Sequence, residues 1–194
     1  MPLIYNGTTI QKVIYNGTTL DKIVYNGVTI FESFNGVLYD GGNWVWNGFK
    51  PTCVKRAANH NCDGAIVYTN AGAQACSMGG SNCPWVSVST NIPITIPGGY
   101  SKLNMSWYFT GTAYDSGYTI NGWGGILTTP TCGDSSWLNK VSSNGWDQKV
   151  PQSGTWTWDV PAGGSYYIHF AAGHERPTDG ASYSQFYATK IWLS

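Results

Sequence analysis

The sequence predicts an all-β protein, in which a short N-terminal meander of β-hairpin repeats precedes an antiparallel, jelly-roll-like β-sandwich. Three observations favour this fold class. Asn-Gly pairs recur every ten residues near the N-terminus, apolar and polar residues alternate over many later segments, and 25 glycines separate those segments. Aromatic residues make up 15% of the 194 residues and charged residues only 10%, which disfavours helices rich in Lys and Glu.

The N-terminal repeat consists of three copies of one motif. Residues 3–10 are Leu-Ile-Tyr-Asn-Gly-Thr-Thr-Ile, and nearly the same eight residues return at 13–20 and 23–30. An Asn-Gly pair between apolar and β-branched residues favours a type I′ turn, because Asn tolerates positive φ and Gly adopts it freely. Each pair is therefore the predicted tip of a hairpin, and the segments between tips are predicted to form an antiparallel meander.

The positions of the turns determine the predicted register of this meander. Val13 is expected to face Leu20, and Lys12 to face Asp21 as an opposite-charge pair. The same register places Asp21 opposite Glu32, a like-charge pair that predicts a bend or an end there. Both faces of the sheet would carry apolar residues, and so few strands cannot cover two apolar faces by themselves. The repeat is therefore expected to need a partner.

The repeat also carries a resemblance to a known class of proteins. Arrays of the form Val-Ile-Tyr-Asn-Gly-Thr-Thr-Leu-Asp-Lys resemble those in tail and appendage proteins of bacteriophages and prophages that infect Gram-positive hosts. In those proteins the array precedes a variable C-terminal domain. The resemblance implies an attachment or oligomerisation module at residues 1–40, with virion proteins and further copies of the chain as partners. A small decorated sheet within one ordinary domain is the alternative.

Charge and hydropathy disfavour several classes of partner. The formal net charge is zero and the ten basic residues are scattered, so we expect neither nucleic acid nor a membrane as partner. The N-terminus lacks the basic region, apolar core and cleavage site of a signal peptide, and no apolar run approaches membrane-spanning length. We therefore expect synthesis in the host cytoplasm and release by lysis as part of a virion.

The C-terminal domain is predicted to span residues 41–194, with its boundary near Gly41, where the repetitive pattern ends. Pro93 and Pro97 lack amide donors, which places the segment between them at a sheet edge. Many short strands with turns between them predict a sandwich, and the arrangement resembles the jelly rolls of carbohydrate-binding modules and phage receptor-binding heads. The predicted strands are 65–69, 85–90, 92–96, 103–110, 118–121, 155–160, 165–172 and 182–193.

Aromatic residues beside Asn, Asp and Gly are the first candidates for a binding site. Trp and Tyr rings offer sugar rings a flat apolar surface, while neighbouring amides and carboxylates bind hydroxyl groups. The charged loop 174–180 adds an Arg and an Asp that would bind a sugar carboxylate or sugar hydroxyls. Core anchoring is the alternative for the tryptophans, and a solvated turn is the alternative for the charged loop. The predicted glycan-binding residues are Tyr114, Asp115, Tyr118, Trp123, Trp146, Asp147, Arg176 and Asp179.

The five cysteines include no closely spaced pair. Although four of them and His60 lie within a short stretch, no spacing matches the usual zinc ligands, so neither a metal nor another cofactor is predicted. Virions act outside cells, where disulfides persist, and this favours bridges such as Cys53 with Cys62 and Cys76 with Cys83. Buried reduced cysteines and a metal site are the alternatives.

No pattern in the sequence demands catalysis. It contains neither the Gly-x-Ser-x-Gly turn of serine hydrolases nor a phosphate-binding glycine loop. Glu175 and Asp179 are the only clustered candidates for the paired carboxylates of a glycosidase. The sequence therefore predicts no enzyme but a phage appendage protein whose sandwich binds carbohydrate on the host surface. A purely structural virion component and a glycan-cleaving enzyme are the two alternatives.

Overall fold

The computed structural model places strands throughout the part of the chain that it describes. The described residues are 4–5, 8–10, 13–20, 22–32, 34–45, 49, 51–58, 72–77, 85–112, 119–130, 139–144, 151–174 and 182–194. These residues form strands, turns and irregular segments without any helix, which confirms the predicted all-β class. Accordingly, no helix within this part is long and apolar enough to cross a membrane.

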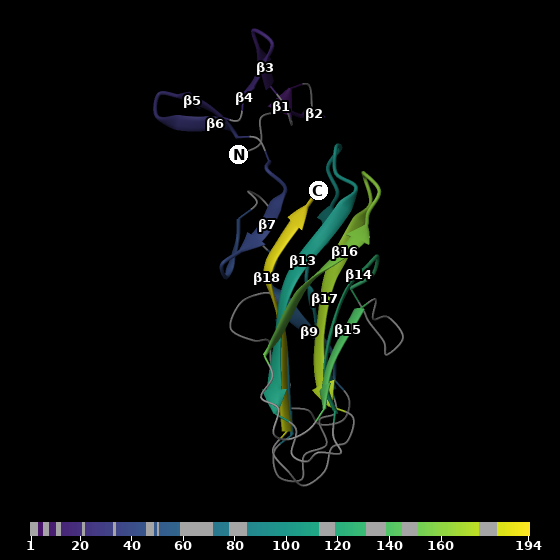
Figure 1. The fold of residues 1–194 in the computed structure, drawn as a ribbon. Helices are drawn as coiled ribbons and strands as arrows, with labels where there is room; N and C mark the ends of the chain where they lie inside the picture. Colours follow the sequence, from purple (N-terminus) through teal and green to yellow (C-terminus); the bar gives the residue numbers. More distant parts are fainter. Residues whose placement is uncertain are drawn as a thin grey trace.

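The N-terminal repeat forms three separate hairpins (Figure 1). Asn16 and Gly17 have φ of 48° and 79°, and Asn26 and Gly27 repeat this pattern, so both tips have the positive φ that a type I′ turn requires. The first tip lies outside the described residues. The hairpins pair β1 (Ile4–Tyr5) with β2 (Thr8–Thr9), β3 (Val13–Tyr15) with β4 (Thr18–Leu20), and β5 (Lys22–Tyr25) with β6 (Val28–Glu32).

The register inside the hairpins is partly as predicted. Val13 lies opposite Leu20, which confirms the prediction. The predicted pairing of Asp21 with Glu32 is wrong, because a register shift between Ile23 and Val24 places Lys22 opposite Glu32 instead. A basic residue thus pairs with an acidic one where a like-charge clash was expected.

Pairing does not continue from one hairpin to the next. Among the described residues, each hairpin is its own two-stranded sheet, so the repeat is a row of hairpins rather than one continuous ladder. Lys12 and Asp21, the predicted opposite-charge pair, lie outside the described residues.

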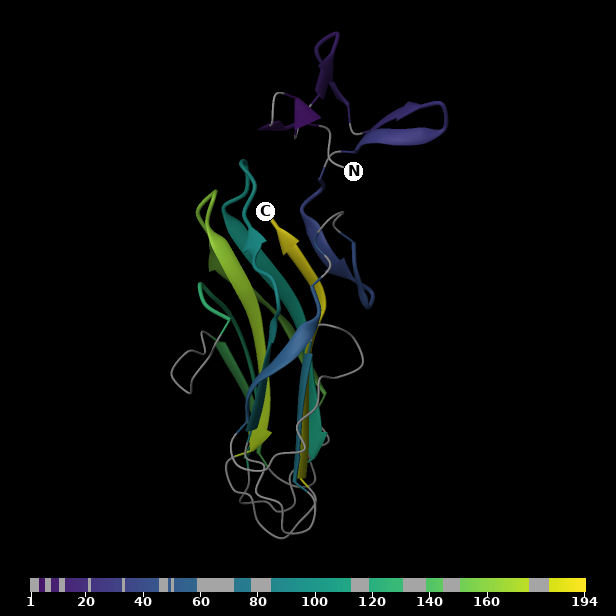
Figure 2. The same ribbon diagram turned by 180° about the vertical axis from the view of Figure 1, so that it is seen from behind.

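The remaining strands build two antiparallel sheets, packed face to face (Figures 1 and 2). The first sheet has the order β16 (Gln152–Asp159), β13 (Lys102–Thr112), β18 (Ser182–Leu193), β7 (Val37–Asp40), β8 (Asn43–Trp44), and β10 (Gly72–Ser77) also pairs with β18. The second has the order β15 (Asn139–Asn144), β14 (Thr119–Leu127), β17 (Ser165–His174), β11 (Trp85–Thr90), β9 (Cys53–Ala58), and β12 (Ile94–Thr95) also pairs with β17.

This strand order is that of a jelly roll. Of its eight main strands, β7, β13, β16 and β18 form one sheet, while β11, β14, β15 and β17 form the other. The strands predicted at 85–90 and 182–193 match β11 and β18. Strand β12, between Pro93 and Pro97, pairs only with β17 among the described strands, which confirms its place at an edge. The strand predicted at 65–69 lies outside the described residues.

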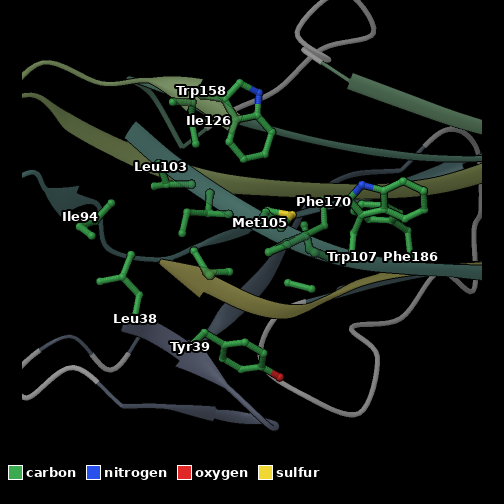
Figure 3. Packing of buried hydrophobic residues seen from close by; sticks show 14 of the residues in the cluster. Leu38, Tyr39, Ile94, Leu103, Met105, Trp107, Ile126, Trp158, Phe170 and Phe186 are labelled. Atoms are coloured by element: carbon green, nitrogen blue, oxygen red, sulfur yellow. The ribbon is translucent and has the colours of Figure 1, made fainter. Parts of the chain in front are cut away.

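The core lies between the two sheets, and Figure 3 shows its packing. Along β13, Leu103, Met105, Trp107 and Phe109 point inward and are buried, while the residues that alternate with them face outward. A Cβ on Gly122 of β14 would lie 2.7 Å from the rings of Phe109 and Phe186, so the bare backbone there makes room for aromatic rings. The strands predicted at 155–160 and 165–172 correspond to β16 and β17, and both contribute residues to this cluster. They do not form a hairpin, because β16 pairs with β13 in the first sheet, whereas β17 lies in the second.

The sandwich takes in residues that precede the predicted boundary near Gly41. Strand β7 pairs with β18, and its Leu38 and Tyr39 are 0% and 1% exposed. Phe34 also packs against the core, and its carbonyl accepts a hydrogen bond of 2.7 Å from the Tyr100 hydroxyl. The hairpins extend from this end of the sandwich, where the C-terminus also lies (Figure 1). The first residues of the sandwich thus follow the third hairpin almost directly.

Candidate functional site

Trp123 is the one predicted glycan-binding residue within the described part of the chain. The other seven lie outside the described residues: Tyr114, Asp115, Tyr118, Trp146, Asp147, Arg176 and Asp179. The same holds for Cys62 and Cys83. Cys53 and Cys76 lie in β9 and β10, where only their backbone is described, so the disulfides stay predictions.

The strands that flank the predicted binding segments end together. Segment 113–118 connects β13 to β14, segment 145–150 follows β15, and segment 175–181 connects β17 to β18. Antiparallel pairing brings the flanking strand ends to one end of the sandwich. The cross-strand pairs that show this are Thr112 with Tyr183, Thr119 with Asn144, and Ile120 with His174. We call this the loop end.

The loop end lies opposite the end from which the hairpins extend (Figure 1). Strands β13 and β17 both run toward the loop end, whereas β18 runs back from it to the C-terminus. Seven of the eight predicted binding residues belong to segments that start and finish at this end. The topology therefore brings together the strand ends that flank three segments far apart in the sequence.

Trp123 lies on the outer face of the second sheet at the middle of β14, four residues from Thr119 at the loop end. Its neighbours in β14, Gly122 and Gly124, face the core, so the indole points away from it. Trp123 is half-buried and does not belong to the core cluster, so the core-anchor alternative does not hold for it. The Lys140 ammonium lies 5.7 Å from the ring centroid, a cation–π distance.

Polar groups lie next to this ring. The Ser142 hydroxyl donates a 2.7 Å hydrogen bond to Oδ1 of Asn121, and these two residues form the cross-strand pair next to Trp123 and Lys140. On the other side, Trp123 faces the small Ala171 of β17. Asn121 itself is 1% exposed, so the half-buried indole, the exposed Ser142 hydroxyl and the Lys140 ammonium are the groups available here. Together they suit a sugar ring, which needs both an apolar surface and hydrogen bonds.

Much of the same outer face is covered, both toward the loop end and away from it. His169 and Ser89 are 1% and 0% exposed although they point outward, because the segment after β14 folds over them. The Ser89 hydroxyl donates to the Pro130 carbonyl at 3.2 Å, and Nε2 of His169 lies 3.2 Å from the Thr129 carbonyl. These polar side chains hold the covering segment in place.

Metal ligands and carboxylate pairs give no further site in the described part. No group of three or more His, Cys, Asp or Glu residues there could hold a metal ion. Glu175 and Asp179, the candidate carboxylate pair, lie outside the described residues.

Comparisons with known proteins add little to this geometry. No family model and no curated protein matches the chain. Solved structures that share part of its shape include the TmCBM61 module in complex with β-1,4-galactotriose, with a TM-score of 0.38 and 7% identity over 73% of this chain and 87% of that one.

Two further structures show the same level of likeness. A CBM4 module has a TM-score of 0.39 and 15% identity, with 71% of this chain and 78% of that one covered. The enzymatically active domain of tailspike protein 4 from bacteriophage CBA120 has a TM-score of 0.39 and 8% identity, with 74% of this chain but 19% of that one covered. At such scores, these likenesses carry no conclusion about what this chain binds.

Proposed function

We propose that the protein is a bacteriophage or prophage appendage protein, attached through its hairpins, whose sandwich binds a carbohydrate of the host surface at the loop end. The observation that carries this proposal is that the strands flanking three predicted binding segments end together at one end of the sandwich. Loops held by rigid sheets are where binding residues concentrate in many folds. The hairpins and the strand ends that flank the predicted binding segments lie at opposite ends of the sandwich, which suits an appendage that bridges virion and host.

The hairpins support the attachment half of the proposal. Their apolar side chains are exposed to an extent that a free surface rarely tolerates. Val24 is 53% exposed and Tyr25 is 68% exposed. A two-stranded hairpin is marginally stable alone in water, so a partner surface would stabilise it as well as cover it. Virion proteins or further copies of this chain are the proposed partners.

Trp123 supports the carbohydrate half. Its half-buried ring lies beside the Lys140 ammonium and close to the exposed Ser142 hydroxyl, in a strand that begins at the loop end. The exposed hairpins need a partner whether or not the sandwich binds sugar. Taken alone, they therefore fit the alternative, a purely structural virion component, equally well. Catalysis is not part of the proposal.

Binding of soluble fragments of Gram-positive wall polysaccharide tests the proposal. Small fragments are used so that assembly through the hairpins does not raise the apparent affinity. We expect saturable binding in calorimetry, weakened at least tenfold by Trp123→Ala and by Trp146→Ala. Tyr15→Ala is the matched control, since it removes an exposed aromatic side chain at the opposite end.

Two results would contradict the proposal. One is the absence of binding up to millimolar concentrations, where weak sugar sites are detectable. The other is an equal loss of affinity in Tyr15→Ala and the two tryptophan variants, since that would place the effect away from the loop end.

A further inference from the structure

The outer face of the first sheet carries three aromatic side chains that the loop-end proposal does not use. Tyr108 in β13 and Tyr187 in β18 are directly opposite each other, with ring centroids 5.2 Å apart and planes tilted by 41°. Trp192 lies farther along β18. All three alternate with buried inward-facing residues and are themselves half-buried, so part of each ring faces outward.

A row of polar side chains separates the tyrosine pair from Trp192. Ser106 lies one row from Tyr108, and its hydroxyl shares a 3.0 Å hydrogen bond with Thr155 of β16. In the next row, the Thr157 hydroxyl donates to Oδ1 of Asn104 at 2.8 Å. The Asn104 row also contains Trp192, which the cross-strand register places beside Asn104.

The distance between the tyrosine pair and Trp192 along this face suits an extended ligand. Tyr108 lies four positions after Asn104 in β13, which corresponds to about 14 Å at roughly 3.4 Å per residue. The face therefore offers an aromatic surface at each end and the hydroxyls of Ser106, Thr155 and Thr157 between them, while the buried Asn104 amide is bonded within the protein. Sugar chains present apolar ring faces and hydroxyl groups in regular succession, which is the pattern that such a surface complements.

The charges on this face pair with one another. Lys102 lies 2.8 Å from Asp159, and Lys190 lies 3.5 Å from Asp40. The Lys190 ammonium also lies 5.9 Å from the centroid of the Trp192 ring. Two basic and two acidic residues leave no net charge on the described side chains of this surface. An anionic chain therefore finds no excess of positive charge here, whereas a neutral one meets no electrostatic penalty.

We propose that this outer face, from the Tyr108–Tyr187 pair to Trp192, is a second carbohydrate site, which binds a neutral sugar chain along its length. It is separate from the loop end and does not depend on it. Burial raises the pKa of Tyr187, and the neighbouring Tyr108 adds to this effect, so the phenol stays protonated and able to donate a hydrogen bond.

Amide NMR on the full chain tests this proposal, because it separates the two sites in one titration. The probes are neutral β-1,4-linked hexasaccharides of glucose, galactose and xylose, with hexagalacturonate as the anionic comparison. We expect saturable shifts of the amides of residues 104–108 and 185–192 with at least one neutral probe. Hexagalacturonate is expected to bind at least tenfold more weakly.

Variants then assign the binding to side chains. Tyr187→Ala and Trp192→Ala should each weaken binding at least tenfold, and Tyr187→Thr serves as a second variant if alanine disturbs the strand. Tyr167→Ala is the matched control, because Tyr167 is also half-buried and lies on the outer face of the other sheet. It should leave the affinity unchanged.

Several results would overturn the proposal. Shifts confined to residues 119–123 and 140–144 would support the loop end and refute this second site. Equal affinity for the anionic hexasaccharide would refute the argument from charge. Shifts of residues 104–108 that depend on protein concentration without sugar would identify the face as a contact between copies of the chain. No saturable shift with any neutral probe up to millimolar concentration would also refute it, while the loop end is tested separately with wall polysaccharide.

Discussion

The hairpins and the sandwich use the same antiparallel pairing and differ in what covers it. In the described residues, five of the seven large hydrophobic side chains that are exposed belong to the hairpins. In the sandwich, the equivalent inward-facing residues lie between two sheets and are buried. Local turn chemistry is thus enough to pair two strands, but a second layer is needed to bury them. The exposed apolar side chains of the hairpins therefore need a covering layer, which must come from a partner.

The largest effect is expected from comparing two N-terminal deletions, one that ends before β7 and one that removes it. Deleting residues 1–32 should leave the sandwich folded, whereas deleting residues 1–40 should leave it largely unfolded. The longer deletion removes β7 with Leu38 and Tyr39, and burying each of these large side chains is worth about 2–5 kcal/mol. Circular dichroism and urea unfolding measure the difference. A folded sandwich after the longer deletion would show that β7 is dispensable.

The shorter deletion also tests the hairpins themselves. We expect the intact chain to self-associate or to bind a virion partner, and the chain without residues 1–32 to remain a monomer in light scattering. The reason is the loss of exposed side chains such as Tyr15 and Tyr25. An unchanged mass and unchanged partner binding after the deletion would contradict the attachment role.

Single aromatic substitutions sharpen the same contrast. Phe186→Ala should lower the free energy of unfolding by about 3–5 kcal/mol, because its fully buried ring packs against Trp156 and Phe170. Tyr25→Ala, at an exposed hairpin position, should change it by less than about 0.5 kcal/mol. Urea unfolding of the two variants gives both values, and comparable losses would mean that the hairpins are part of the cooperative unit.

Sequence patterns predicted the parts of the fold that local chemistry determines. The Asn-Gly tips and strands β11 and β18 follow from turn residues and alternation. Strand β15 was missed because Val141 is its only apolar residue, as suits an edge strand with little core contact. Strand β7 was assigned to the repeat because composition changes after it, whereas its place in the sandwich depends on pairing with the distant β18.

The candidate sites, too, were only partly predictable from sequence patterns. The loop residues were predicted from their types, but only the jelly-roll topology shows that their flanking strands end together. The run Trp107-Tyr108-Phe109 has three aromatic residues in succession, and the sequence does not tell which of them point outward. Pairing with β16 and β18 orients Tyr108 away from the core, so the candidate site on the outer face can be recognised only from the structure.

A glycine substitution tests how tightly the two sheets are packed. Gly122→Ala should cost about 1–3 kcal/mol, because the added Cβ would meet the rings of Phe109 and Phe186 at 2.7 Å. Gly17→Asn at a hairpin tip should change unfolding of the sandwich by less than about 0.5 kcal/mol, since nothing lies within 4 Å of a Cβ there and Asn tolerates positive φ. Urea unfolding compares the two, and a neutral Gly122→Ala would mean that the rings move aside easily.

The smallest effect concerns the junction between the two regions. Tyr100→Phe removes the hydrogen bond to the Phe34 carbonyl but keeps the ring contact at 5.4 Å, so it should cost about 1 kcal/mol at neutral pH. Burial raises the pKa of Tyr100, while in the unfolded chain it is about 10.

The folded state therefore retains the Tyr100 proton at pH values where the unfolded chain has lost it. The stability that protonated Tyr100 contributes is complete below about pH 10 and declines as the pH rises through the folded pKa of Tyr100. The variant lacks this contribution, so its stability should converge toward that of the wild type above about pH 10. Tyr187, whose pKa is also raised by burial, is present in both proteins and cancels in the difference. Urea unfolding at a series of alkaline pH values measures that difference, and a gap that stays constant would show that Tyr100 does not titrate with unfolding.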